Sequence, residues 1–109
     1  MSEPKPRLTR DALLKLDDRP LREVEIPGLP GTVVVRQPDA RTMALIAKST
    51  ADENGNQDTL EFEARLIFEG LVEPKLEPAD LEWIKGLSAS TFKALAREII
   101  SKKNESSTA

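Results

Sequence analysis

The sequence has 109 residues, of which 39% are hydrophobic and 32% charged, and its formal net charge is −3 at pH 7. This length and balance predict a single domain with a modest aliphatic core, and the mixed charges disfavour a nucleic-acid partner. Neither cysteine nor histidine is present. Disulfides and thiolate metal sites are therefore excluded, and the lack of the commonest general base disfavours an enzyme. We expect no cofactor and no metal, and no apolar run is long enough to span a bilayer.

The N-terminal part of the sequence predicts a flexible tail followed by a short helix. Residues 1–8 contain two prolines and alternating charges, and we expect them to be flexible. Thr9 is suited to cap a helix over residues 10–16, and Asp17-Asp-Arg-Pro20 ends that helix. Its apolar residues are Leu13, Leu14 and Leu16.

Residues 21–36 carry the one β signal of the sequence. Two apolar runs, at residues 24–26 and 32–35, flank the connector Pro27-Gly-Leu-Pro-Gly31, whose prolines fix φ and whose glycines permit positive φ. The pattern predicts a β-hairpin. Val24 and Ile26 share one face of its first arm, whereas residues 33–35 make the second arm apolar on both faces. Either a helix covers one face and a partner the other, or the chain itself covers both.

Two helices are predicted in the middle of the chain, separated by a polar loop over residues 51–58. Asp39 is suited to cap a helix over residues 40–50, which has a thin apolar stripe. The helix over residues 59–72 is the most hydrophobic, with apolar residues around more than half of its circumference. Such a helix either lies at the centre of the domain or keeps one face for a partner.

The last part of the chain predicts two more helices and a polar tail. Pro78 is placed to begin a helix over residues 78–86, and Ser88 to cap a helix over residues 89–101. Trp83 falls outside the apolar stripe of its helix, so it is either partly buried under a neighbouring loop or a hot spot for binding. Residues 102–109 are polar, and we expect them to be flexible.

These elements predict an α+β, mainly α fold, in which a small bundle of about four to five helices carries one N-terminal β-hairpin. Residues 9–101 are expected to form a single globular domain. The helices over residues 59–72 and 89–101 are the candidates to cover the hairpin, because their apolar faces are the widest.

Charged clusters in the sequence have simpler interpretations than catalysis. The loop over residues 52–63 matches several ligand positions of an EF-hand, but Gln57 stands where the loop needs glycine, which favours a solvated loop. Asp80 and Glu82 lack a catalytic partner and suit a helix N-terminus. Basic residues near the N-terminus are interleaved with acids, which indicates a mixed surface or a weak anion contact; they are Arg7, Arg10, Lys15, Arg19 and Arg22.

Three segments follow one another in a suggestive order. They are the helix start Leu8-Thr-Arg-Asp-Ala-Leu-Leu14, the hairpin Val24-Glu-Ile-Pro-Gly-Leu-Pro-Gly-Thr-Val-Val-Val-Arg36, and the segment Leu71-Val-Glu-Pro-Lys-Leu-Glu-Pro-Ala-Asp-Leu81. In their order and spacing, over residues 8–100, the chain resembles the tail assembly chaperones of long-tailed bacteriophages. The hairpin loop departs from the family pattern, because Leu-Pro-Gly replaces Leu-Gly-Gly and changes the flexibility of the loop.

The resemblance implies a non-enzymatic protein of the host bacterial cytoplasm that holds the tape-measure protein soluble and recruits the major tail protein. Such a chaperone is absent from the mature virion, and a homo-oligomer is compatible with this role. The alternative is a small bacterial adaptor or regulatory module that binds an unrelated protein. The candidate partner-binding residues are apolar positions of the hairpin and of two helices: Val24, Ile26, Leu29, Val33, Val35, Phe62, Leu66 and Trp83.

Overall fold

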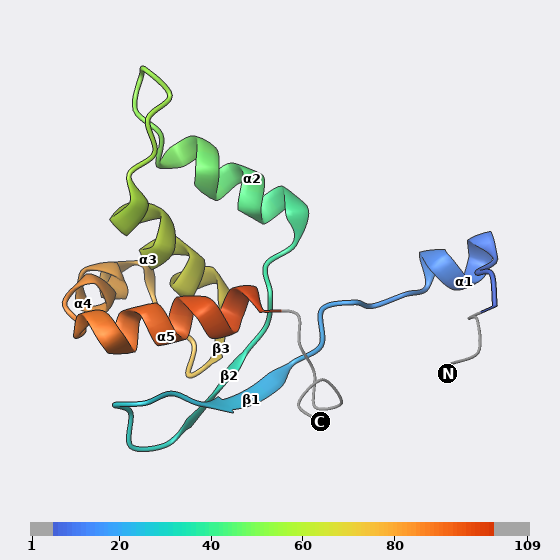
Figure 1. The fold of residues 1–109 in the computed structure, drawn as a ribbon, viewed down its shortest axis with the longest axis horizontal. Coiled ribbons are helices and arrows are strands. Elements are labelled where there is room, and N and C mark those ends of the chain that lie inside the picture. The colour runs from blue at the N-terminus through green and yellow to red at the C-terminus, as the bar shows by residue number, and fades with distance from the viewer. Residues whose placement is uncertain (1–5, 102–109) are drawn as a thin grey trace, which may run out of the picture.

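A three-stranded antiparallel sheet lies beside a group of helices, and one short helix stands apart from them (Figure 1). The computed structural model describes residues 6–101 and confirms the α+β, mainly α class with an N-terminal hairpin. The helices are α1 (Arg10–Leu14), α2 (Ala40–Ser49), α3 (Thr59–Gly70), α4 (Leu81–Lys85) and α5 (Ala89–Ile100), with a 3-10 turn, η1 (Pro78–Asp80), before α4. The strands are β1 (Arg22–Glu25), β2 (Thr32–Val35) and β3 (Leu71–Glu73).

The third strand, β3, extends the predicted hairpin. β1 pairs with β2, placing Val24 opposite Val33, and β3 pairs with the other edge of β2, so the strand order is β1-β2-β3. The expectation of a hairpin as the one β element is therefore wrong. Three residues between a helix and a proline carry too little alternation to reveal a strand. Because β3 covers β2, the hairpin leaves one edge open, on β1.

α3 ends where β3 begins, two residues before the predicted end of this helix. Leu71 has extended backbone angles, with φ of −83° and ψ of 115°, and the Arg36 backbone N–H donates to the Gly70 carbonyl at 2.8 Å. A Cβ atom on Gly70 would collide with the Ile99 side chain. Glycine thus permits the close approach of the end of α3 to α5 at this junction.

Other predicted boundaries also differ from the structure, by one residue at the ends of α2 and α5 and by more in the first and fourth helices. The first helix ends at Leu14, with Lys15 as its C-cap, because the chain then turns towards Arg19, whose backbone N–H donates to the Asp17 carboxylate at 3.1 Å. The fourth helix begins as the 3-10 turn η1, in which the side chains of Glu77 and Asp80 form a capping box.

Four helix starts depend on side-chain caps, of which the sequence predicts three, at Thr9, Asp39 and Ser88. The carboxylate of Asp39 accepts a hydrogen bond from the Thr42 backbone N–H at 2.8 Å and begins α2. Asp58 begins α3 in the same way. Thr9 and Ser88 cap α1 and α5. Each cap satisfies a backbone donor that has no partner inside the helix, so these four starts are fixed by local chemistry.

The core lies between the sheet and the helices α3, α4 and α5. One buried cluster joins side chains of the hairpin, α3, α4 and α5, and its most deeply buried large members are Val35, Ile67, Ile84 and Ile99. α3 contacts α2, α4, α5 and β3. The prediction that the most hydrophobic helix lies at the centre of the domain is therefore confirmed.

α1 is separated from this core. Figure 1 shows α1 at the far side of the molecule from α4, joined to β1 by an extended segment, and no residue of α1 is buried. We call residues 6–16 the N-terminal arm and residues 22–101 the body. The predicted flexible tails over residues 1–8 and 102–109 lie outside the described residues, apart from residues 6–8, which have no regular secondary structure.

Candidate protein-binding surfaces

The tip of the hairpin is packed on α5 and does not project from the body. The Thr91 hydroxyl donates to the Pro27 carbonyl at 3.3 Å. Next to it Gly28 has a φ of +97°, and a Cβ atom there would collide with the Thr91 hydroxyl. Thr91 is itself held by Ser88, which caps α5. Backbone conformation and space together therefore require glycine at position 28.

The other end of the hairpin is attached to α5 by Arg22. Its side chain is 12% exposed and contacts both the Glu98 carboxylate, at 3.4 Å, and the Glu98 backbone carbonyl. A guanidinium with two acceptors in a partly buried position is held more firmly than a surface ion pair. The hairpin is thus attached to α5 at both of its ends.

The candidate partner-binding residues fall into three groups in the structure. Four of them are buried in the core of this chain: Ile26, Val33, Val35 and Leu66. Three are half-buried: Val24, Leu29 and Phe62. Trp83 has 56% of its surface exposed. The structure therefore places the buried hairpin positions and Leu66 of α3 together in the hydrophobic core. Among the candidate partner-binding residues, Trp83 is the exposed one.

The two faces of the hairpin have different surroundings. The face that carries Val33 and Val35 is covered by the helices of this chain. The opposite face carries Val34, which is half-buried, together with Glu23 and Thr32, whose side chains form a hydrogen bond of 2.6 Å. The second apolar face expected from residues 33–35 is thus a single valine beside polar side chains.

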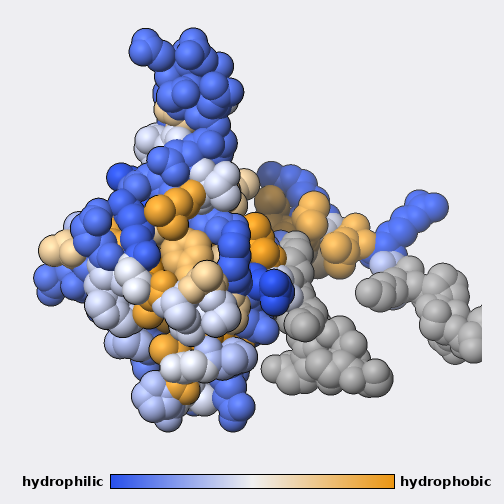
Figure 2. Space-filling view, turned by 60° about the vertical axis from the view of Figure 1, so that its left-hand side comes forward, coloured by the Kyte–Doolittle hydropathy of each residue, from blue (hydrophilic) through white to orange (hydrophobic). Residues whose placement is uncertain are grey.

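The body exposes large apolar side chains on four different helices. They are Leu45 on α2, Leu60 on α3, Trp83 on α4 and Ile100 on α5. Figure 2, which brings the α4 side forward, shows hydrophobic residues at the surface between hydrophilic ones. Single exposed apolar residues are common, but two grooves also open beside members of this set.

The first groove, which we call the α2–α3 groove, has a volume of about 540 Å³. Its apolar lining comes from Leu45 and Ile46 on α2, Phe68 on α3 and Leu81 on α4. Glu69 is one of its polar lining residues. The groove exists because α2 contributes one buried residue, Ile46, and so covers α3 incompletely. The thin apolar stripe of α2 is the sequence signal for this feature.

The second groove has a volume of about 340 Å³ and lies where α3 and α5 begin. Leu60, Leu87 and Phe92 give it an apolar lining. Lys93, which also lines it, forms an ion pair of 2.9 Å with Glu63. This arrangement suits an apolar side chain of a partner, with charges beside it that fix orientation.

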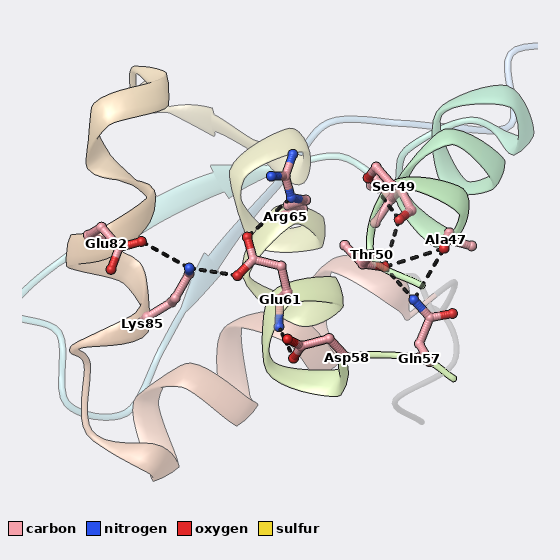
Figure 3. Close-up of polar contacts among 10 residues, drawn as sticks. Ala47, Ser49, Thr50, Gln57, Asp58, Glu61, Arg65, Glu82 and Lys85 are labelled. Carbon is pink, nitrogen blue, oxygen red and sulfur yellow. Dashed lines mark hydrogen bonds and ion pairs between the residues drawn. The ribbon is translucent and has the colours of Figure 1, made fainter. Parts of the chain in front are cut away.

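A network of charged side chains joins α3 to α4 (Figure 3). The Lys85 ammonium lies 2.6 Å from the Glu61 carboxylate and 2.9 Å from the Glu82 carboxylate, and Arg65 contacts Glu61 at 3.3 Å. The hydrogen bond from Lys85 lowers the pKa of Glu61 below its ordinary value of 4.5. The hydrogen bond to Glu61 in turn raises the pKa of Lys85 above 10.5. Opposite charges this close favour both charged forms, so Lys85 and Glu61 form an ion pair that joins the two helices.

The loop between α2 and α3 is closed by its own hydrogen bonds. The Asp52 carboxylate accepts from the backbone N–H groups of Asn54 and Asn56, at 2.9 and 2.8 Å, and Gly55 has a φ of +84°. On the inner side, Gln57 donates to the Thr50 hydroxyl (Figure 3). Within residues 6–101 no group of three acidic side chains is arranged to hold a metal ion.

The segment between the arm and β1 is pinned to the body. The Arg36 guanidinium donates to the Arg19 carbonyl at 2.6 Å and lies 3.3 Å from the Asp17 carboxylate. Arg19 donates to the Gln37 carbonyl at 3.0 Å. The backbone hydrogen bond from Arg19, together with Arg36, lowers the pKa of Asp17. These contacts fix the path of the chain from Asp17 onwards. The N-terminal arm leaves the body at that point.

The arm carries its apolar residues into solvent. Leu8, Leu13, Leu14 and Leu16 are each more than half exposed, and the arm is visible in Figure 2 as orange beside blue at the right of the molecule. Sequence reasoning placed a helix here but missed that no neighbour covers it. A local apolar pattern cannot show whether a covering element exists.

Comparison with known proteins gives no relative for this chain. It matches no family model, no curated protein and no solved structure. No helix within the described range, residues 6–101, has the length and apolar character needed to cross a membrane.

Proposed function

We propose that the protein is a tail assembly chaperone of a long-tailed bacteriophage, which binds the tape-measure protein and recruits the major tail protein. In this role it acts in the host bacterial cytoplasm, without catalysis, and is not retained in the mature virion. The resemblance of its helix start, hairpin and Val72-Glu-Pro-Lys-Leu76 segment to that family motivates the proposal.

The observation that carries the proposal is the distribution of exposed apolar side chains over the body. Leu60 and Trp83 lie on different helices, and Leu60 lines a groove of about 340 Å³. Several small apolar contacts suit a long helical client, because each engages one turn of its apolar face. Small contacts of this kind give moderate affinity for the client. Later tail subunits are therefore able to displace the chaperone from the tape-measure protein.

Co-expression with the tape-measure protein of the same phage genome tests the proposal. We expect the tape-measure protein to become soluble and to elute with the chaperone on a sizing column, and purified major tail protein to join the complex. The double variant Leu60→Ser/Trp83→Ser should weaken client binding at least tenfold, because both side chains are exposed and their loss leaves the core intact.

Leu21→Ser is the matched control, since Leu21 has a similar exposed fraction but lies outside the body. It should leave client binding unchanged. A tape-measure protein that stays insoluble with the wild-type chain, or a double variant that keeps the full affinity, would contradict the proposal.

A further inference from the structure

We propose that the N-terminal arm of one copy docks into the α2–α3 groove of a second copy, so that the protein self-associates by exchanging arms. The proposal rests on the geometry of the arm and the groove and does not depend on the function proposed above. Its occupant is a second copy of this chain.

The arm lacks a cover within its own chain. No residue of α1 is buried, and exposed fractions reach 66% at Leu14 and 60% at Leu16. A helix of five residues gains little stability from its own hydrogen bonds, since isolated helices need about 12–15 residues to be stable. An apolar surface that binds α1 would therefore stabilise the helix as well as cover its leucines.

The arm cannot readily reach the groove of its own body. Arg36 holds the chain at Asp17 and Arg19, and Lys15 and Leu16 are the two residues between that point and the end of α1. Two or three extended residues span only about 7–11 Å. Figure 1 shows α1 on the opposite side of the body from α4, which contributes Leu81 to the groove. A second copy has no such restriction.

The groove fits the apolar end of the arm. Its volume of about 540 Å³ accommodates the side chains of Leu13 and Leu14, which are adjacent at the end of α1. Leu45, which lines the groove, has 61% of its surface exposed. Docking thus removes apolar surface from water on both partners, which is the main driving force of association.

The charges of the arm and of one groove wall are complementary. Residues 6–16 contain three basic residues and one acidic residue. On the α3–α4 side, Glu69 and Arg65 line the groove, and Arg65 is already paired with Glu61 at 3.3 Å. The acidic residues Glu77, Asp80 and Glu82 adjoin the lining residues Pro78 and Leu81. Glu69 forms no ion pair with any residue in the described part of the chain. The α2 wall is bordered by Arg41 and Lys48, so the basic side of the arm is drawn to the α3–α4 side.

Each copy has one arm and one groove, so two copies related by a two-fold axis form two identical contacts. Reciprocal exchange closes the assembly as a dimer, because the second contact uses the remaining arm and groove. The second contact forms within the complex at high effective concentration, which strengthens two contacts that are individually small.

Sedimentation of the full chain at increasing concentration tests the exchange. We expect a monomer–dimer equilibrium that Leu13→Ser/Leu14→Ser, in the arm, and Leu45→Ser, in the groove, each weaken at least tenfold. All three side chains are exposed, so the melting temperature should not change at concentrations at which the wild-type chain is monomeric. Leu21→Ser and Leu60→Ser are the matched controls, with similar exposure outside both surfaces, and should leave the dimer intact.

Disulfide trapping identifies which copy supplies the arm. The chain has no cysteine, so a Leu14→Cys variant mixed with a Leu45→Cys variant should give a covalent product of twice the mass on oxidation. A chain carrying both substitutions should cross-link between copies and not within one.

Three results would overturn the proposal. They are a monomer at every concentration, a dimer that the arm and groove variants weaken no more than the controls do, and a cross-link confined to single chains. The sedimentation and cross-linking experiments use no client, so their failure leaves the chaperone proposal standing, and failure of client binding leaves the exchange standing.

Discussion

Gly28 lies at the tip of the hairpin with a backbone conformation that side chains with a Cβ atom rarely adopt. Its φ is +97°, and the Thr91 hydroxyl occupies the space that a Cβ atom would need. Thr91 also donates to the Pro27 carbonyl. One glycine and one threonine therefore fix where the hairpin meets α5, through sterics and a hydrogen bond together.

Gly28→Ala should destabilise the protein by about 1–3 kcal/mol, because the substitution combines a strained φ with a collision. Gly31→Ala is the matched control in the same loop, since nothing lies within 4 Å of its added Cβ atom. Urea denaturation measures both variants. Equal midpoints for the two variants would mean that the tip is able to shift away from α5.

At the scale of elements, the network around Lys85 joins α4 to α3. α4 has five residues and one buried side chain, Ile84, so its own helix formation contributes little stability. Lys85 reaches Glu61 on α3 with 20% and 25% of the two side chains exposed. The ion pair thus orients a short helix that packing holds at a single point.

Replacing Glu61 should change how stability depends on pH. Because the folded state lowers the pKa of Glu61 below 4.5, its contribution is present above that value and is lost as the pH falls through the lowered pKa. Lys85, whose pKa is raised above 10.5, contributes below 10.5 and loses this contribution at higher pH. Glu61→Gln should therefore reduce the free energy of unfolding by a small, pH-independent amount between these limits.

Denaturation at pH 7 and pH 3 measures this effect, and the difference between wild type and Glu61→Gln should shrink at pH 3. Glu53→Gln, in the exposed α2–α3 loop, is the control, and it should leave the free energy of unfolding unchanged at both pH values. If the difference in stability between wild type and Glu61→Gln grew as the pH fell, ionised Glu61 would not be the stabilising form. The lowered pKa values of Asp17 and Asp39 leave the variant with some acid sensitivity.

At the scale of the whole molecule, one core joins sheet and helices. Val35 is fully buried in the cluster that also contains side chains of α3, α4 and α5, whereas the neighbouring Val34 points to the other face of the sheet and is half-buried. With a single core, loss of packing at Val35 affects every element of the body at once.

Val35→Asp should destabilise the body by about 3–5 kcal/mol, which is comparable to the whole stability of a small domain. Val34→Asp changes the same residue type on the other face of the sheet, and it should lower the free energy of unfolding much less. Trp83 fluorescence and far-UV circular dichroism measure the unfolding of both variants, and their transitions should coincide. A Val35→Asp protein as stable as Val34→Asp would show that the sheet is dispensable for the core.

Local features of this fold could be predicted from the sequence. The caps Asp39 and Ser88 and the hairpin loop act through neighbours a few residues away, so their residue types suffice. β3 could not be predicted in this way, because it depends on pairing with β2, which is distant in sequence. The thin apolar stripe of α2 indicates incomplete cover of a neighbour, but the α2–α3 groove also needs the position of α4. The arm was predicted as a helix, but its exposure depends on where Arg36 holds the chain.

The candidate contact residues show a second limit. Val35 and Leu66 were selected as apolar positions for a partner, yet they lie in the core of this chain. Water expels an apolar side chain in the same way whether the cover is intramolecular or comes from another protein. Trp83 stands apart because its position outside the helical stripe is itself a signal of exposure.

The contact between Pro27 and Thr91 joins residues that are 64 positions apart. During synthesis the hairpin is made before the helices that cover it, and its inner face is fully covered only when α5 has been translated. Such long-range closure slows folding and exposes Ile26 and Val33 in the interval. The body therefore completes its fold late in translation, and a chain interrupted before Ser88 lacks the part of the cover that α5 supplies.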